Sequence, residues 1–205
     1  MDGVPEEWVV YNVDSENWRL WVPALFDTDE TTRAIAAEVL GACGDVEAIR
    51  PLLAALESVR GMIAGGGPVA RALVRLRDEW TVEVFAEALH DYRPYVRRAA
   101  AEALGWLQDV RAFDALIAAL GDSFFGVRLE ASWALGELGD PRALAPLVEK
   151  LQDEDENVRR NAIEALVRLG DPRAAPALRA ALQDRDPGVR AAAEDALNRL
   201  PPEAA

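Results

Sequence analysis

The sequence contains very little lysine, cysteine and histidine. Lys150 is the single lysine, and the rest of the 22 basic residues are arginine. One cysteine, Cys43, excludes an internal disulfide and any metal cluster made of cysteines. One histidine, His90, excludes a site that needs two imidazole ligands. Neither a Ser-His-Asp set nor a dinucleotide fingerprint is visible. We therefore expect no metal, no cofactor and no enzymatic activity.

Long apolar segments are also missing. None approaches the roughly 18 residues that a membrane span needs, and the start MDGVPEEW lacks the apolar core of a signal peptide. Acidic residues outnumber basic ones by 36 to 22, which gives a net charge of −14. Such a chain is repelled by phosphate backbones and anionic lipids. We expect a cytoplasmic protein of 205 residues that binds neither nucleic acid nor membrane.

A spacing of 31 residues dominates the sequence from residue 89 onward. The dipeptide Val-Arg recurs four times at this spacing, and three columns of leucine keep the same step. The members are Val96-Arg97, Val127-Arg128, Val158-Arg159 and Val189-Arg190; Leu89, Leu120, Leu151 and Leu182; Leu104, Leu135, Leu166 and Leu197; and Leu107, Leu138, Leu169 and Leu200. Four columns with one spacing indicate an internal repeat.

Each repeat is predicted to hold two helices. Apolar residues recur every three or four positions over 94–107 and again over 113–120, as on one side of an amphipathic helix. The link from Gly139 to Arg142 reads Gly-Asp-Pro-Arg. Glycine suits the left-handed residue that ends a helix, aspartate caps the next helix, and proline fits its first turn. Pro146 lies further inside, which predicts a loose first turn in the second helix.

The N-terminal half carries a weaker form of this pattern. Trp18, Trp21 and Leu25 match the second-helix columns and predict one helix that closes this end. Gly65-Gly66-Gly67-Pro68 replaces Val-Arg in the second repeat. No Gly-Lys-Ser/Thr follows these glycines, so they predict a flexible surface loop and not a phosphate site.

Neither helix of a repeat can bury its apolar side alone, so stacked repeats should share one core. We expect a single domain over residues 1–205. Its predicted parts are an N-terminal cap (1–26), repeats at 27–57, 58–90 (degenerate), 91–121, 122–152 and 153–183, and a C-terminal capping helix (184–205).

The segments VRRAAAEALGWLQD, VRLEASWALGELGDPRALAPL and VRRNAIEALVRLGDPRAAPAL resemble the short HEAT-like repeats named after phycobilisome lyases. The resemblance covers about residues 27–200 and implies a right-handed all-α solenoid of about five two-helix repeats. It also implies a ladder between repeats, made of Arg33, Arg97, Arg128, Arg159 and Arg190 and the loop aspartates Asp45, Asp78, Asp109, Asp140 and Asp171. Gly66 stands where one arginine belongs, so the ladder should be interrupted there.

A second stripe follows the first helices on the side opposite the apolar core, which by resemblance lines the concave surface of the solenoid. It is rich in aromatic residues and arginines, which dominate binding hot spots. The candidate binding residues are Tyr95, Arg98, Glu102, Trp106, Phe125, Leu129, Trp133, Glu137, Arg160 and Arg168, with Arg71 and Arg75 in the degenerate repeat. The alternative is that these rings pack on neighbouring helices and serve only the fold.

We expect a scaffold that holds a helix or an extended segment of a partner protein on this stripe. Aromatic residues would anchor the segment, and arginines would pair with its carboxylates. The alternative, implied by the resemblance, is a bilin lyase subunit or a chaperone for a pigment-bearing protein, with Arg71, Arg75 or Arg98 on the propionates. A DNA repair glycosylase of HEAT-like repeats matches the helix count but not the charge. Iron-binding hydroxylases of this type use several His-Glu pairs, which one histidine excludes.

Overall fold

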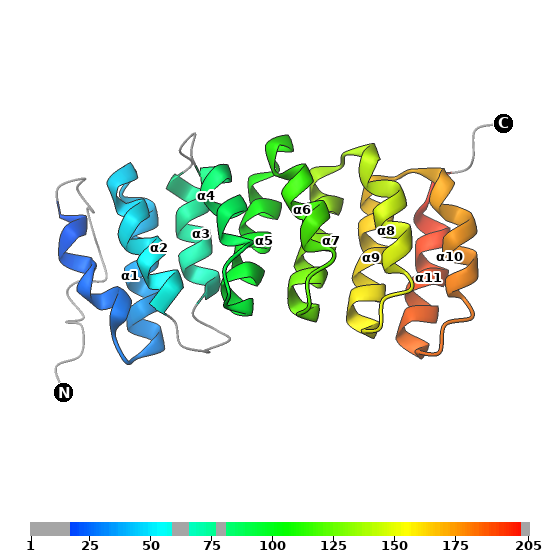
Figure 1. Ribbon diagram of the computed structural model, residues 1–205, viewed down its shortest axis with the longest axis horizontal. Coiled ribbons are helices and arrows are strands. Elements are labelled where there is room, and N and C mark those ends of the chain that lie inside the picture. Colours follow the sequence, from blue (N-terminus) through cyan, green and yellow to red (C-terminus); the bar gives the residue numbers. More distant parts are fainter. Residues whose placement is uncertain (1–16, 59–65, 77–80, 202–205) are drawn as a thin grey trace. The chain divides into compact units, whose positions relative to one another are not determined.

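The computed structural model describes residues 17–58, 66–76 and 81–201 (Figure 1). Within these ranges the regular elements are all helices. None of those helices is long and apolar enough to cross a membrane. The chain divides into two compact units, one ending at Thr81 and the other beginning at Val82. Each unit is described by itself, and the expectation of a single domain over 1–205 stays a prediction.

The first unit is built from pairs of helices. In α1, Asp29 caps the N-terminus by accepting a hydrogen bond from the backbone N–H of Thr32, and the helix packs against α3 and η3. The elements are the 3-10 helices η2 (Trp18–Trp21), η3 (Pro23–Phe26) and η4 (Val46–Ala48), and the α-helices α1 (Glu30–Ala42), α2 (Ile49–Ser58) and α3 (Gly66–Leu76).

The N-terminal cap differs from its prediction. The expected single helix over Trp18 to Leu25 is two short 3-10 helices, η2 and η3. Pro23 explains the break, because it has no N–H to donate to a carbonyl one turn earlier. Trp18 and Leu25 are buried as the pattern indicates. The Trp18 indole N–H donates to Asp45 Oδ2 at 2.8 Å, which ties the cap to the following repeat. Residues 1–16 of the predicted cap lie outside the described residues.

The glycine-rich segment also differs from its prediction. Gly66 and Gly67 belong to the first turn of α3, where a surface loop was expected. Pro68 follows in the same turn, where its missing N–H has no helical acceptor in any case. Gly65 lies outside the described residues.

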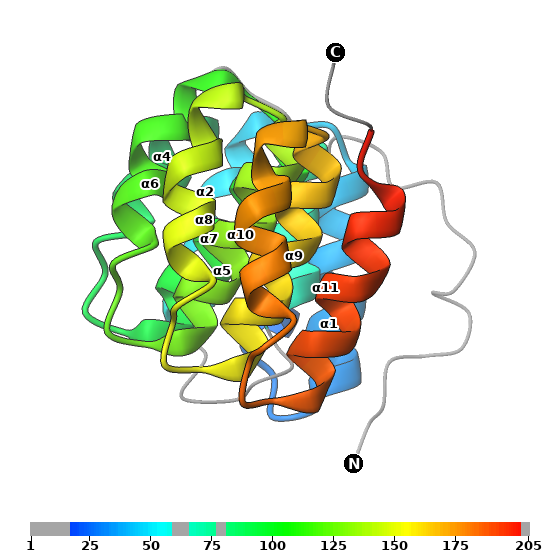
Figure 2. The ribbon, with the colours of Figure 1, turned by 90° about the vertical axis from the view of Figure 1, so that its right-hand side faces the viewer.

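The second unit stacks helix pairs in sequence order. The first helices of the repeats, α5, α7, α9 and α11, contact one another in that order, and α6, α8 and α10 pack on α7, α9 and α11 (Figure 2). The elements are α4 (Thr81–Ala88, beginning at the boundary residue), α5 (Pro94–Leu107), η5 (Val110–Ala112), α6 (Phe113–Ala119), α7 (Phe125–Leu138), η6 (Pro141–Ala143), α8 (Leu144–Lys150), α9 (Glu156–Leu169), η7 (Pro172–Ala174), α10 (Ala175–Ala181) and α11 (Pro187–Arg199). The chain is an all-α solenoid of repeats.

The sequence columns fall where the pattern places them. Leu104, Leu135 and Leu166 are fully buried. Gly139 ends α7 in the left-handed conformation with φ of 67°, as the link predicts. Each second helix starts with a 3-10 turn before its α-helical part, which is the loose first turn that Pro146 predicts in α8.

Small residues let successive first helices approach closely. A β-carbon added at Gly136 would stand 2.8 Å from the α-carbon of Ala165 on the next first helix. A larger side chain would therefore push α7 and α9 apart. The first helices form the closely spaced layer of the second unit.

Candidate functional site

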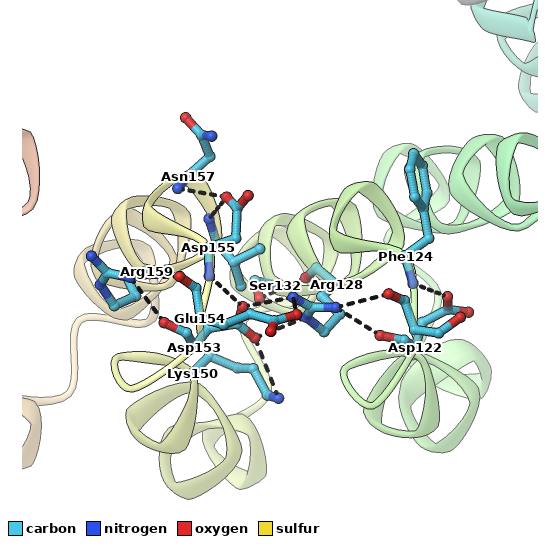
Figure 3. Close-up of polar contacts among 12 residues, drawn as sticks. Asp122, Phe124, Arg128, Ser132, Lys150, Asp153, Glu154, Asp155, Asn157 and Arg159 are labelled. Carbon is cyan, nitrogen blue, oxygen red and sulfur yellow. Dashed lines mark hydrogen bonds and ion pairs between the residues drawn. The ribbon is translucent and has the colours of Figure 1, made fainter.

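Ion pairs at the loop ends link successive repeats of the second unit. The guanidinium of Arg128 donates from Nε and Nη2 to both oxygens of Asp153, at 2.9 and 2.8 Å (Figure 3). Its Nη1 donates to the backbone carbonyl of Asp122 at 2.9 Å. Both side chains of the Arg128–Asp153 pair are almost fully buried, with 7% and 5% exposed. One arginine thus fixes the loop before its own helix to the loop before the next helix.

The same pairing occurs in the repeats on either side. Arg97 binds Asp122 in the same bidentate way, and Arg159 binds Asp184, so each pair spans 25 residues. These three pairs are called the arginine ladder below. Because every guanidinium also donates to a backbone carbonyl six residues earlier, the ladder satisfies polar groups of the loops as well as its own charges.

The aspartates expected to form this ladder have another role, so that part of the prediction is wrong. Asp109, Asp140 and Asp171 lie in the link inside each repeat, where they cap the 3-10 turn and bind the arginine two residues later. Asp45 accepts from Trp18, and Asp78 lies outside the described residues. The correct partners are the aspartates of the link between repeats.

The two ends of the predicted ladder make backbone contacts. Arg33 donates to the carbonyls of Asp27 and Thr28, and Arg190 donates to those of Asp184 and Arg185. At the position before Asp122 in the 31-residue register, Asp91 is bound by Arg93 of its own loop, through Nε at 2.8 Å and Nη2 at 2.7 Å. A local arginine thus pairs with Asp91, as expected where Gly66 replaces a ladder arginine.

Burial and hydrogen bonding act in opposite directions on the ladder carboxylates. Burial raises the pKa of Asp153, but the hydrogen bonds from Arg128 and from the Asp155 N–H outweigh it, and the pKa lies below its ordinary value. Asp122 and Asp184 have lowered pKa values for the same balance of causes. The ladder aspartates are therefore ionised at neutral pH.

The predicted binding stripe centres on two half-buried tryptophans. Trp106 of α5 and Trp133 of α7 meet edge to face, with ring centroids 6.4 Å apart and planes at 81°. The Trp133 ring also covers the backbone of Gly105. The structure therefore brings the pair together as predicted, and it also shows the packing on a neighbouring helix that the alternative expected.

The indole N–H groups separate these two tryptophans from a structural one. Trp18, which is buried, donates its N–H to Asp45. No residue in the described ranges accepts a hydrogen bond from the N–H of Trp106 or Trp133, and neither nitrogen is buried. Each therefore presents a donor to solvent.

Three further rings gather at the N-terminal ends of α5 and α7. Tyr95 lies 5.5 Å from Phe124, and Phe124 lies 5.1 Å from Phe125, measured between ring centroids. Tyr95 and Phe125 keep 39% and 42% of their surface exposed. Phe124 is the N-cap of α7 and makes no capping hydrogen bond, whereas Asp155 caps α9 through its side chain. An aromatic N-cap forgoes about 1 kcal/mol of helix stabilisation.

Most charges of the stripe are paired within the chain. Arg98 Nε donates to Glu130 at 3.1 Å, and Arg168 Nε lies 2.6 Å from Glu137. Arg160 is exposed and donates to Asn157 at 2.5 Å. The expectation that Arg98 and Arg168 pair with carboxylates of a partner is therefore not supported, because glutamates of the chain already occupy them.

The remaining stripe residues complete the picture. Leu129 is half-buried, and its carbonyl accepts from Asn161 Nδ2 at 2.9 Å. Glu102 is half-buried one turn before Trp106. Burial raises the pKa of Glu130, although Arg98 acts against this. The exposed Arg71 and Arg75 lie on α3, in the first unit. The second unit alone thus forms the stripe from Tyr95 to Arg168. No group of three or more histidines, cysteines, aspartates and glutamates suited to a metal ion occurs among the residues described.

The arrangement of stacked two-helix repeats agrees with comparisons of the sequence. The family profile described as HEAT repeats matches residues 68–124 and 113–198, and the one described as PBS lyase HEAT-like repeat matches residues 32–58. The chain belongs to the HEAT repeat family. A search of curated proteins gave no match.

Solved structures similar to this HEAT-repeat protein include natural and designed solenoids. The complex of CpcE and CpcF of phycocyanin lyase from Nostoc sp. PCC7120 is 26% identical, with a TM-score of 0.59 over 94% of this chain and 79% of that one. Human deoxyhypusine hydroxylase is 27% identical, with a TM-score of 0.53 over 91% and 74%. A designed armadillo repeat protein in complex with the peptide (KR)4 is 20% identical, with a TM-score of 0.57 over 91% and 100%.

Sequence reasoning missed some polar members of the stripe in this HEAT-repeat protein. Glu130 pairs with Arg98, Asn161 binds the Leu129 carbonyl, and Gln108 donates to Glu137. The 31-residue register could have indicated the first of these, because Arg98 and Glu130 stand one repeat and one residue apart. Phe124 was expected only as a turn residue, yet its ring joins Tyr95 and Phe125.

Proposed function

We propose that the protein is a non-enzymatic interaction module that binds a helix or an extended segment of a partner protein on the first helices of its second unit. The observation that carries the proposal is the pair Trp106 and Trp133, whose indole N–H groups have no acceptor among the described residues. Buried structural tryptophans normally find an acceptor. A partner backbone carbonyl would supply one, and the half-buried rings would supply apolar contact.

The edge rings support the same surface. Phe124 replaces a capping aspartate, so stability of α7 is given up where Tyr95 and Phe125 stay exposed. An anchor for a ligand explains this loss better than packing does. Among similar solenoids, the designed armadillo repeat protein carries a peptide, which supports a peptide-binding role for this fold.

Selection from a random peptide library displayed on phage tests the proposal. The wild-type protein should enrich peptides whose binding is lost in the variant Trp106→Ala/Trp133→Ala. The control is Tyr92→Ala, which removes an aromatic residue that is 85% exposed in the loop before α5. Circular dichroism and thermal melting should show that all three proteins are folded. Enrichment that is equal in the wild type and the tryptophan variant would contradict the proposal.

A second candidate function is that of a bilin lyase subunit or a chaperone for a pigment-bearing protein. It is favoured by the PBS lyase HEAT-like repeat over residues 32–58 and by the similarity to the phycocyanin lyase complex. The exposed Arg71 and Arg75 would face the propionates. Titration of the protein into free phycocyanobilin tests this: a red-shifted absorbance that Arg71→Ala/Arg75→Ala weakens would support it, and an unchanged spectrum would exclude it.

A further inference from the structure

We infer that the segment bound by the first-helix stripe is cationic, with lysine or arginine side chains placed against Trp106 and Trp133. The inference rests on the proposed function and adds the chemistry of the partner. It departs from the expectation that arginines of the stripe receive carboxylates, because those arginines are already paired.

The charge of the surface around the tryptophan pair is negative. On α5 and α7 the stripe carries three glutamates, Glu102, Glu130 and Glu137, but one arginine, Arg98. When α9 is added, four glutamates stand against three arginines. The whole chain has a net charge of −14, so its long-range field also attracts cations. A cationic segment is complementary to this surface, whereas an acidic segment is repelled.

The tryptophan rings provide the second part of the recognition. A guanidinium or an ammonium over an indole face is attracted by the ring quadrupole. This chain uses the same contact elsewhere: the guanidinium carbon of Arg142 lies 4.0 Å from the ring centroid of Phe113, and that of Arg93 lies 5.0 Å from Tyr92. Within the described ranges no cation lies over Trp106 or Trp133. Their outer surfaces are therefore available to a cation from a partner.

Geometry places the carboxylates and the rings together. Glu137 lies one turn after Trp133 on α7 and at the register position of Trp106, one repeat later. Its carboxylate is half-buried, with 24% exposed, and accepts from Arg168 and Gln108. A lysine or arginine from a partner can join this network from the solvent side, since a carboxylate has about four lone-pair sites.

Fluorescence anisotropy with labelled octapeptides tests the inference. The probes are (Lys-Arg)4, (Asp-Glu)4 and the neutral (Gly-Ser)4, each titrated with the wild-type protein. We expect (Lys-Arg)4 to bind at least tenfold more tightly than the other two, and its affinity to fall as salt rises.

Variants separate a local site from attraction by net charge. Trp106→Ala/Trp133→Ala keeps the charge of the chain and should weaken (Lys-Arg)4 binding at least fivefold. Glu137→Gln should weaken it severalfold, whereas Glu149→Gln makes the same change of charge on α8, at an exposed residue outside the stripe, and should leave it unchanged. Glu137→Gln alters only a side chain at the surface, so it remains informative if the tryptophan variant is unstable.

Each alternative result overturns the inference. Equal binding of all three peptides would remove the charge preference, and equal effects of Glu137→Gln and Glu149→Gln would reduce it to net charge. If the library selection gives tryptophan-dependent peptides that are neutral or acidic, this inference fails and the proposed function stands. If no selected peptide depends on the tryptophans, both fail.

Discussion

The indole of Trp133 lies against Gly105 of the preceding first helix, where an added β-carbon would stand 2.3 Å from ring atom Cζ3. The glycine and the tryptophan are therefore matched across the contact between α5 and α7. Trp133 closes the space that the missing side chain leaves, and in doing so it takes the position next to Trp106 that the binding stripe requires.

Gly105→Ala should destabilise the protein by about 1–3 kcal/mol, because the new methyl group overlaps the indole. The double variant Gly105→Ala/Trp133→Ala should lose less than the sum of the two single changes, since removing the ring makes room for the methyl group. Urea denaturation of the four proteins of this cycle measures the coupling.

Gly136 provides the control for that cycle. Its added β-carbon would meet the α-carbon of Ala165 at 2.8 Å, which is backbone and cannot be removed by substitution. Gly136→Ala should therefore destabilise the protein, and Ala165→Gly should not restore it. Strict additivity at Gly105 and Trp133 would contradict the packing described here.

Arg128→Ala should destabilise the protein by about 3 kcal/mol, because it leaves Asp153 buried without its counter-charge. Arg173→Ala removes an arginine that also pairs with an aspartate, but 71% of its side chain is exposed. We expect a loss of at most about 1 kcal/mol there. Chemical denaturation of both variants makes the comparison, and equal losses would show that burial of the ladder has no energetic consequence.

The ladder also predicts sensitivity to acid. Asp122, Asp153 and Asp184 have pKa values below those of an unfolded chain, so their contribution to stability is complete above about pH 4, the ordinary aspartate value. It is lost as the pH falls through the lower native values, because protonation then favours the unfolded state. Urea midpoints measured between pH 6 and pH 2 should fall, and Asp153→Asn should make that fall shallower. An unchanged slope would contradict the assignment.

Glu130 should behave in the opposite way. Burial raises its pKa, so its ionisation costs stability above the native pKa, and this cost disappears as the pH falls below the ordinary glutamate value of about 4.3. Glu130→Gln should therefore raise the thermal midpoint at pH 7 and leave it unchanged near pH 3. A variant that is less stable at pH 7 would show that the ion pair with Arg98 outweighs the cost of burial.

The repeat could be predicted from the sequence because its signals are local and agree with one another. The helix of residues 94–107 and its equivalents follow from the spacing of apolar residues, and the left-handed Gly139 follows from the link motif. The cap could not be predicted in the same way. Its apolar spacing is helical, but Pro23 removes a donor and divides the segment into η2 and η3.

The ladder shows where periodicity alone is insufficient. Aspartates recur every 31 residues in two columns, one with Asp140 and one with Asp153, and both columns lie in loops. Which column meets Arg128 depends on how neighbouring repeats stack, and the sequence holds no local signal for that. The same holds for the indole N–H groups, because the absence of an acceptor is a property of the packed surface.

The ladder has a consequence for how such a chain changes length. Each pair joins the same two positions of adjoining repeats, 25 residues apart, from Arg97–Asp122 to Arg159–Asp184. Excision of one whole 31-residue block would bring Arg97 opposite Asp153, an equivalent carboxylate. Gene duplication or loss in steps of one block therefore preserves every junction, whereas an insertion of any other length breaks one.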